Sequence, residues 1–183
     1  SDFIAEGIDQ TRGWFYSLHA IGTFLFDKPA YKNVIVNELI LDKEGQKMSK
    51  RLGNAVDPFT TIEEYGSDPL RWYMITNAQP WDNLKFDISG VDEVKRKFFG
   101  TLYNTYNFFA LYANIDGFSG HGEASLTESD RWILSRLNTC IGGVQAALTA
   151  YNFAEAASLL YQFLWREFCD WYIELSKGAL YGT

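Results

Sequence analysis

Apolar residues recur at spacings of three and four along most of the second half of this chain. That spacing gathers them on one face of an α-helix. Because such a face must be buried against another element, several amphipathic helices of this length predict an all-α antiparallel helical bundle over residues 91–183. The three apolar faces comprise Phe99, Leu102, Tyr103, Tyr106, Phe109 and Ala110; Ile133, Leu137, Ile141, Val144 and Leu148; and Leu160, Phe163, Leu164, Phe168, Trp171 and Leu175.

Two of these helices have start signals. Thr127 stands three residues before Asp130, in the arrangement of a capping box, ahead of the second apolar face. Asn152, with Glu155 three residues later, can cap the third helix. We therefore predict helix starts at both positions.

The first half has a different pattern. The β-branched run from Val34 to Val36 continues to Leu41 and predicts one buried strand, and residues 3–5 predict the end of another. A helical pattern runs from about Gln10 to Phe26, and residues 79–89 have the composition of a loop. Asp57-Pro58 and Ser67-Asp68-Pro69 are typical helix starts. Residues 1–90 are thus predicted to be an α/β part.

Composition sets limits on function. Hydrophobic residues make up 47% of the chain, which is enough to bury a core. A net charge of −7 argues against a general nucleic-acid binder, although it allows a local basic site. The sequence has no apolar run long enough to span a bilayer. Cys140 and Cys169 stand too far apart to indicate a zinc site, so we predict two buried, reduced thiols in a cytoplasmic protein.

The most informative motif is the basic run KMSKR, Lys47 to Arg51. It follows the predicted strand and the turn Asp42–Gly45, and residues 42–51 hold four basic and two acidic side chains on an acidic chain. Lys47 and Lys50, with Ser49 between them and the loop's N–H groups, can bind the oxygens of a polyphosphate. A solvated basic turn is the alternative, and the strand–turn setting favours the phosphate site.

A second motif, Glu6 to Phe15, lies at a predicted strand-to-helix junction. In open α/β sheets ligands bind beyond the carboxyl ends of the strands. Glu6, Asp9 and Gln10 would offer hydrogen-bond partners there, and Gly7 would let the backbone approach a ligand closely. The alternative is an acidic helix start, with Trp14 and Phe15 as ordinary core residues.

Together the two motifs resemble those of the class I aminoacyl-tRNA synthetases. KMSKR is similar to the class signature KMSKS, with Arg51 in place of the last Ser. The stretch Glu-Gly-Ile-Asp-Gln-Thr-Arg-Gly-Trp-Phe resembles the isoleucyl branch of the family in particular. A valyl or leucyl relative is the nearest alternative.

The resemblance implies a site and a reaction. Lys50 would bind the phosphates of ATP, which comes with Mg²⁺, and Lys47 and Ser49 would support the catalytic loop. The aminoacyl-adenylate would lie on Glu6, Gly7, Asp9, Gln10 and Trp14, with Trp14 forming a wall of the isoleucine pocket. No metal site or zinc is expected in the segment. The partners would be isoleucine, ATP and tRNA(Ile), and the protein would be a cytoplasmic monomer.

The resemblance also implies a division of the chain. Residues 1–90 would be the C-terminal half of a Rossmann-like catalytic domain with the KMSK loop and connecting helices. Residues 91–183 would begin the helical anticodon-binding domain.

One departure from the family matters for activity. The first signature of the class, HIGH, is absent from this sequence, and so is an editing domain. His19, in a predicted helix, and His121, in a Gly-rich loop, are expected to be packing or surface residues. We therefore expect a fragment that is inactive alone.

A function of another class is a non-catalytic RNA-binding module. The run Lys95-Arg96-Lys97 at the start of the first long helix is the feature that favours it. A solvated helix face is the plainer interpretation of such a run.

Overall fold

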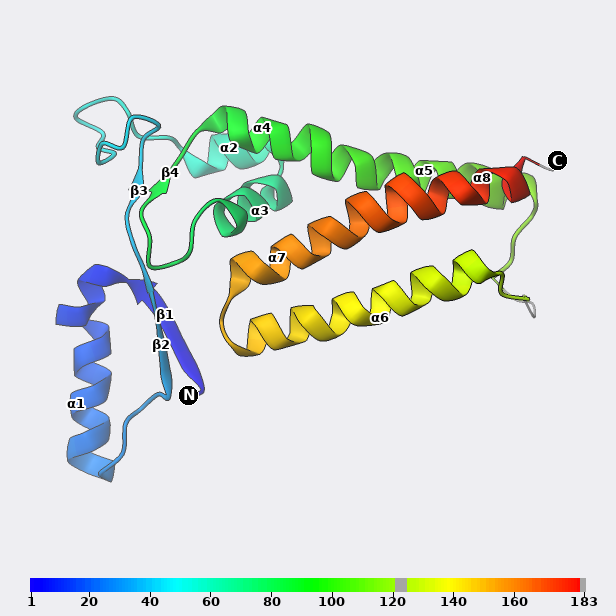
Figure 1. Cartoon of the computed structure of the whole chain (residues 1–183). Helices are drawn as coiled ribbons and strands as arrows, with labels where there is room; N and C mark the ends of the chain where they lie inside the picture. The colour runs from blue at the N-terminus through cyan, green and yellow to red at the C-terminus, as the bar shows by residue number, and fades with distance from the viewer. Residues whose placement is uncertain (121–124, 182–183) are drawn as a thin grey trace. The chain divides into compact units, whose positions relative to one another are not determined.

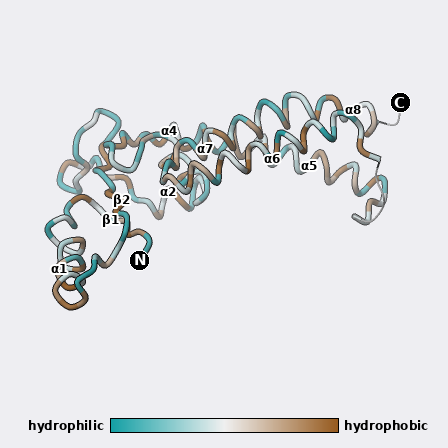
Figure 2. Tube along the Cα trace, turned by 60° about the horizontal axis from the view of Figure 1, so that its bottom comes forward, coloured by the Kyte–Doolittle hydropathy of each residue, from teal (hydrophilic) through white to brown (hydrophobic). Residues whose placement is uncertain are grey.

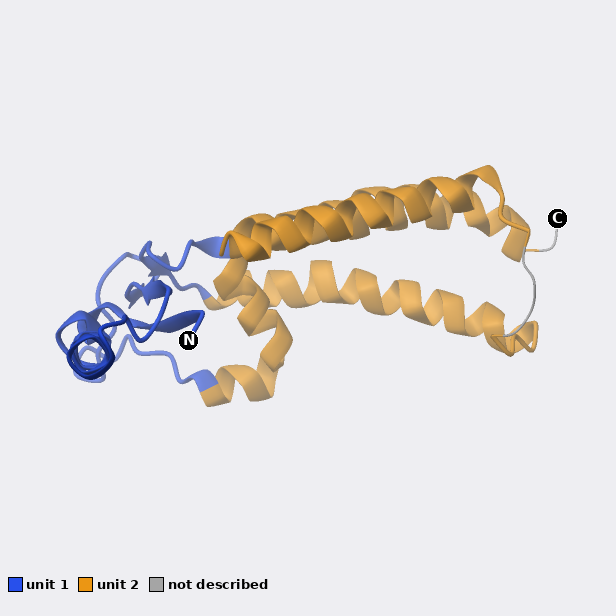
Figure 3. Cartoon of the chain, turned by 90° about the horizontal axis from the view of Figure 1, so that it is seen from below, with its two compact units in different colours: residues 1–58, 77–87 blue, residues 59–76, 88–183 orange. Residues whose placement is uncertain are grey.

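The fold was examined in a computed structural model, which describes residues 1–120 and 125–181. The structure is mostly helical with a few short strands (Figure 1). His121 lies outside the described residues. The chain divides into two compact units, drawn in different colours in Figure 3: unit 1 holds residues 1–58 and 77–87, and unit 2 holds residues 59–76 and 88–183. Residues 59–76 thus group with the long helices, whereas the predicted division at residue 90 placed them in the α/β part.

Unit 1 begins with a strand–helix–strand segment. Strand β1 (Phe3–Gly7) pairs in parallel with β2 (Asn33–Asn37), with Phe3 opposite Asn33 and Gly7 opposite Asn37. Helix α1 (Trp14–Phe26) makes the crossover that parallel strands require. The core of this unit includes the buried side chains of Phe15, Ile35, Leu84 and Phe86.

The start of α1 corrects the predicted helix from Gln10. Residues Ile8–Arg12 form a 3₁₀-helix, η1, in which the Gln10 carbonyl accepts from the Gly13 N–H at 3.1 Å. The Trp14 N–H is then left for the Gln10 side chain, whose Oε1 accepts it at 2.9 Å. The α-helix therefore begins four residues later than its apolar pattern suggested.

The single strand predicted from Val34 to Leu41 was also wrong, because the structure has two. After β2 the chain leaves β1, and the Glu38 N–H donates to the Pro80 carbonyl at 2.8 Å. Strand β3 (Ile40–Leu41) then pairs in parallel with β4 (Leu84–Lys85), in a second two-stranded sheet. The segment 79–89, predicted as a loop, thus contains a short strand and the start of the next helix.

Unit 2 is built of helices. Helix α2 is Pro58–Tyr65 and α3 is Ser67–Asn77, so both begin where the sequence predicted. The long helical segments that follow contain α4 (Ile88–Val94), the π-helical turn η2 (Lys95–Phe99) and α5 (Gly100–Ile115); α6 (Glu128–Thr149); and α7 (Phe153–Gln162), the π-helical η3 (Phe163–Ile173) and α8 (Glu174–Leu180).

The predicted caps in unit 2 are confirmed. Thr127 accepts from the Asp130 N–H at 3.2 Å, and the Asp130 carboxylate accepts from the Thr127 N–H at 2.8 Å. Asn152 caps α7 by accepting from the Glu155 N–H at 3.3 Å. Between the two helices Tyr151 adopts a left-handed conformation with φ of 57°, which turns the chain within three residues.

The core of unit 2 lies where these helices meet. Helix α6 packs on α7 and η3, and α5 also contacts η3. Val91 is fully buried, and the rings of Trp72 and Phe98 stack with centroids 4.3 Å apart. The stack ties α3 to the start of the long helix that contains α5.

The cysteine prediction was correct for one residue of two. Both thiols are free, and Cys140 is buried, which raises the pKa of its thiol. Cys169 is only half-buried, with its sulfur 3.4 Å from the Thr105 hydroxyl. Cys169 is therefore more accessible to solvent than Cys140.

The described residues contain neither a candidate membrane span nor a candidate metal site. No helix among them combines the length and apolar character that a membrane span needs. No group of three or more His, Cys, Asp or Glu side chains in the described ranges is placed to hold a metal ion.

Candidate functional site

The KMSKR loop is held at its base by a tight turn. Directly after β3, the Asp42 N–H donates to the Gln46 carbonyl at 2.8 Å, and an Asp42 carboxylate oxygen accepts from the Gln46 N–H at 2.7 Å. Gly45 takes a φ of 85°, which L side chains rarely adopt. Leu41 and Lys47 form an antiparallel bridge, so the chain reverses direction and the basic run begins beside the strand it has just left.

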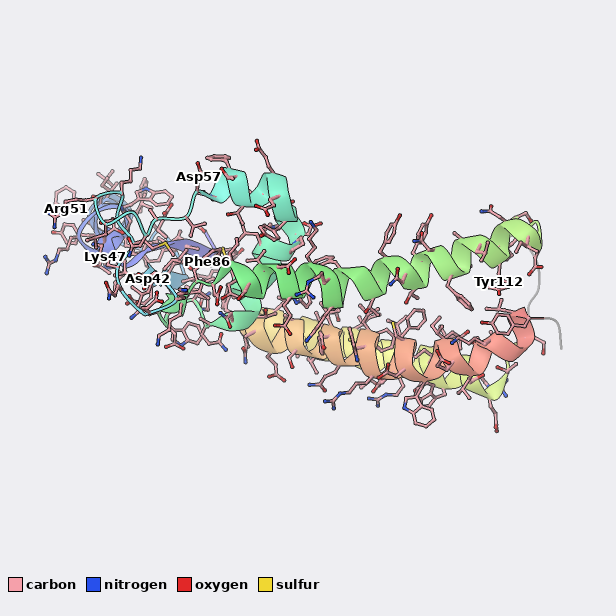
Figure 4. The ribbon with its side chains drawn as sticks, turned by 90° about the horizontal axis from the view of Figure 1, so that it is seen from above. Asp42, Lys47, Arg51, Asp57, Phe86 and Tyr112 are labelled. Carbon is pink, nitrogen blue, oxygen red and sulfur yellow. The ribbon has the colours of Figure 1, made fainter. Side chains whose placement is uncertain are left out.

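Asn54 holds the far side of the same loop (Figure 4 labels Asp42, Lys47 and Arg51). Its amide nitrogen donates to the Asp42 carboxylate at 2.7 Å and to the Lys47 carbonyl at 3.3 Å. Its carbonyl oxygen accepts from the Ser49 N–H at 2.9 Å. One half-buried side chain therefore connects the two ends of the basic run with the turn before it.

These contacts also fix the charge state of Asp42. The N–H of Gln46 and the amide of Asn54 stabilise the carboxylate and lower the pKa of Asp42. The ionised carboxylate is the acceptor for both donors.

The cations of the loop, in contrast, are free. Lys47, Lys50 and Arg51 are exposed, and the described part of the chain provides none of them with an ion pair. Lys43, in the preceding turn, lies 3.7 Å from Glu44. A hydrogen-bonded loop that presents unpaired cations is suited to a polyphosphate anion.

The loop's backbone is less available than the sequence suggested. The Ser49 N–H is used by Asn54, and the Leu52 N–H donates to Ser49 at 3.2 Å. The Gly53 N–H donates to the Lys50 carbonyl at 3.3 Å. Phosphate contacts would therefore come mainly from lysine side chains.

The residues of the second motif gather at the carboxyl end of β1. Glu6 is exposed near the end of the strand, Asp9 and Gln10 lie in η1, and Trp14, which is 48% exposed, opens α1. The Gln10 amide donates to the Asp9 carboxylate at 3.0 Å. We call Glu6, Asp9, Gln10 and Trp14 the shelf, after their shared place at the end of this strand.

A side chain at position 7 would meet a steric conflict that the sequence did not reveal. A Cβ atom on Gly7 would lie 2.7 Å from an Asp9 carboxylate oxygen, and one on Gly13 would lie 2.7 Å from Gln10 Oε1. The two glycines therefore make room for the side chains of the shelf itself. The Gln10 side chain belongs to the shelf and also accepts from the N–H of Trp14 at the start of α1. The predicted ligand site and the predicted helix start therefore share this residue.

The predicted site residues thus form two groups in unit 1, the loop and the shelf. Among the described residues no hydrogen bond or ion pair joins Glu6, Asp9 or Gln10 with Lys47 or Lys50. Sequence reasoning did not identify Asp42 and Asn54 as organisers of the loop. Their only signal was their place at either end of the basic run.

Two other candidates have local roles. His19 lies exposed in α1 with its ring centroid 6.3 Å from that of Tyr31, as expected for a packing or surface residue. Arg96 pairs with Asp92 at 2.8 Å, Lys97 pairs with Glu93 at 2.5 Å, and Lys95 donates to the Glu64 carbonyl. These contacts are those of a solvated helix face, and they do not favour the RNA-binding module.

Comparison with known proteins gives the family. Residues 1–87 match the family described as tRNA synthetases class I (I, L, M and V), and residues 130–183 match the anticodon-binding domain of tRNA ligase. The isoleucine–tRNA ligase of Bacteroides fragilis is 60% identical over 187 residues, which cover the whole chain. The chain belongs to the class I aminoacyl-tRNA synthetases.

Other synthetases agree with this assignment. The isoleucine–tRNA ligases of Porphyromonas gingivalis and Thermus thermophilus are 61% and 46% identical, each over 97% of the chain. The chain spans 16% of the length of the Bacteroides and Porphyromonas enzymes and 17% of the Thermus enzyme. A structural match is the LeuRS of Agrobacterium radiobacter K84, solved in a ternary complex with tRNA and LeuAMS. It has a TM-score of 0.74 at 20% identity, over 97% of this chain and 23% of that one, and it shows a shared fold.

Proposed function

We propose that this synthetase segment serves the ATP-dependent attachment of isoleucine to tRNA(Ile) through isoleucyl-adenylate. The observation that carries the proposal is the KMSKR loop, which is held by Asp42 and Asn54 while its cations stay exposed and unpaired. The choice of isoleucine is supported by the names of the relatives, which are 44 to 61% identical over nearly the whole chain. We also propose that the enzyme works in the cytoplasm.

In this proposal the loop binds the triphosphate of ATP. Lys50, with Lys47 beside it, would neutralise the negative charge that develops on the departing pyrophosphate. The carboxylate of the amino acid is already a nucleophile, so catalysis needs positioning and charge stabilisation more than a general base. Mg²⁺ commonly binds through substrate phosphates with one or two carboxylates, and it would reach the site with ATP.

The shelf at the end of β1 would hold the adenylate. Glu6 and Asp9 offer exposed carboxylates that suit an ammonium group or ribose hydroxyls, and Gly7 keeps the backbone beside them open. Trp14, half-exposed at the start of α1, would form one wall of the isoleucine pocket. Gln10 would orient Asp9 through the hydrogen bond between their side chains.

The finer fold assignments belong to the same proposal. We propose that β1, α1 and β2 are part of a Rossmann-like nucleotide-binding domain, which their parallel pairing supports. We propose that the long helices of unit 2 begin an antiparallel anticodon-binding bundle. The tight connection at Tyr151 and the packing of α6 on α7 support this arrangement.

The test uses a chimera in which the chain replaces its matching segment in the Bacteroides fragilis isoleucine–tRNA ligase. The assay is ATP–pyrophosphate exchange with isoleucine, valine or leucine as the amino acid. Lys50→Ala is expected to lower kcat about 100-fold or more, the usual cost of removing a group that stabilises developing charge. Lys43→Ala, which removes an exposed lysine of the same turn already close to Glu44, is the matched control and should change little.

Two results would count against the proposal. Equal activity of the Lys50→Ala and Lys43→Ala chimeras would show that the loop does not bind the phosphates of ATP through Lys50. Exchange that depends on valine or leucine rather than isoleucine would remove the substrate assignment.

A further inference from the structure

Two half-buried side chains, Asp42 and Asn54, hold the KMSKR loop from its two ends. Asp42 and Asn54 are twelve residues apart, and their side chains meet at 2.7 Å. Together they bind the N–H of Gln46, the N–H of Ser49 and the carbonyl of Lys47. We call this pair the Asp42–Asn54 clamp.

The clamp occupies positions where other side chains would leave polar groups unmatched. The Asn54 amide is a donor toward Asp42 and Lys47 and an acceptor toward Ser49, so both its ends are used. Asp42 is an acceptor toward Gln46 with one oxygen and toward Asn54 with the other. A carboxylate opposite a carboxamide satisfies this set of donors and acceptors, whereas two carboxylates would repel each other.

The contacts of the clamp lie next to the cations and not on them. Lys47 is held through its carbonyl, and Lys50 follows Ser49, whose N–H is held, so both ammonium groups remain free to bind an anion. Because the backbone of the loop is held, its lysines lie at defined positions. The loop therefore loses less conformational entropy when the anion binds.

We propose that the Asp42–Asn54 clamp is a positioning device that sets the KMSKR loop for the departing pyrophosphate of ATP. This inference rests on the function proposed above. Asp42 and Asn54 would touch no substrate atom and would act only through the placement of Lys47 and Lys50. Loss of the clamp should therefore lower kcat for exchange or raise KM for ATP, and it should leave KM for isoleucine unchanged.

The test is an exchange of the two side chains in the chimera described above. Asn54→Asp places two carboxylates in contact and should lower kcat/KM for ATP by about 10- to 100-fold, the scale of a misplaced catalytic group. Asp42→Asn should have a smaller effect, because one amide oxygen remains to accept. The double variant D42N/N54D restores a carboxamide opposite a carboxylate and keeps every clamp contact except the 3.3 Å bond to Lys47. It should recover most of the activity that Asn54→Asp loses.

Trypsin cleavage gives a second measurement that does not depend on ATP. Lys47, Lys50 and Arg51 are exposed trypsin sites within the loop, and Arg12 and Lys32 are exposed sites elsewhere in unit 1. Asn54→Asp should be cleaved faster in the loop and at an unchanged rate at Arg12 and Lys32. D42N/N54D should return loop cleavage toward the parent rate.

The results distinguish a failure of the clamp from a failure of the proposed function. If Lys50→Ala abolishes exchange and Asn54→Asp alters neither exchange nor loop cleavage, the clamp is refuted and the proposed function stands. Faster loop cleavage with unchanged exchange likewise refutes the positioning role. If Asn54→Asp loosens the loop and Lys50→Ala has no effect on exchange, the proposed function has failed. If D42N/N54D does not recover the exchange activity that Asn54→Asp loses, the pairing of the two side chains is also contradicted.

Discussion

At the scale of single residues, the contact between Asp42 and Asn54 holds the loop that presents Lys47 and Lys50. Lys47 and Lys50 were identified because a basic run after a strand and turn is unusual on an acidic chain. Asn54 was not assigned a role, because its partners are decided by the path of the loop. Its bond to Asp42 bridges twelve positions, and no local pattern encodes that contact.

Two glycines lead to a prediction at this scale, because the effect of replacing a glycine on stability depends on the space around it. A Cβ on Gly90 would lie 2.3 Å from a ring carbon of the buried Tyr73, and one on Gly142 would meet nothing within 4 Å. Gly90→Ala should destabilise the chain by about 1–3 kcal/mol through overpacking. Gly142→Ala, the matched control in the interior of α6, should stabilise it by roughly 0.5–1 kcal/mol.

Urea unfolding of the two variants, followed by circular dichroism, provides the measurement. A Gly90→Ala protein as stable as its parent would show that Tyr73 does not pack against that position.

At the scale of elements, the capped helix starts of unit 2 were predictable, whereas the start of α1 and the limits of the strands were not. The caps at Thr127 and Asn152 consist of a side chain and an N–H three positions away, so the sequence contains the whole interaction. The break between β2 and β3 depends instead on residues 80 and 84–86, which lie some forty positions further along. A β-branched run shows that a strand can form, and it does not show which partners will interrupt it.

The capping box at the start of α6 predicts a pH dependence. Two donors from Thr127 and one from Tyr172 lower the pKa of Asp130 below its ordinary value of 3.8. The folded state therefore binds a proton less readily than the unfolded chain. This contribution to stability is complete above the ordinary pKa and is lost as the pH falls through the lower folded value.

Thermal unfolding from about pH 7 down to pH 3 tests this cap. Asp130→Asn should be less stable than the parent near neutrality, and the difference should shrink on acidification. Thr127→Ala should cost about 1 kcal/mol as a lost N-cap. Glu128→Gln, in the same first turn, is the control and should follow the pH profile of the parent more closely. A constant difference between Asp130→Asn and the parent over this range would contradict the assignment.

At the scale of the whole molecule, the sequence predicted an α/β part followed by long helices, and the chain divides into two compact units, the second of which is built of helices. It did not predict that residues 59–76 would group with the helices, because that grouping depends on contacts such as the stack of Trp72 on Phe98. Much apolar surface is also exposed. On α1, Ile21, Phe24 and Leu25 are 55%, 90% and 64% exposed, and Figure 2 shows hydrophobic turns of this helix in brown.

That exposure leads to the last prediction, which concerns the chain by itself. Apolar patches of this kind mark surfaces that pack against further protein, and the chain spans 16% of its Bacteroides relative. In the function proposed above the loop and the shelf are only part of the ATP site, and the HIGH signature expected from the family is absent from the sequence. The 183-residue chain should therefore show no isoleucine-dependent ATP–pyrophosphate exchange under conditions in which the chimera is active. Mixing the chain with free isoleucine and ATP at the highest soluble concentration gives the most sensitive assay. Robust exchange that disappears in Lys50→Ala would show that these residues form a complete catalytic site, and that expectation would then be wrong.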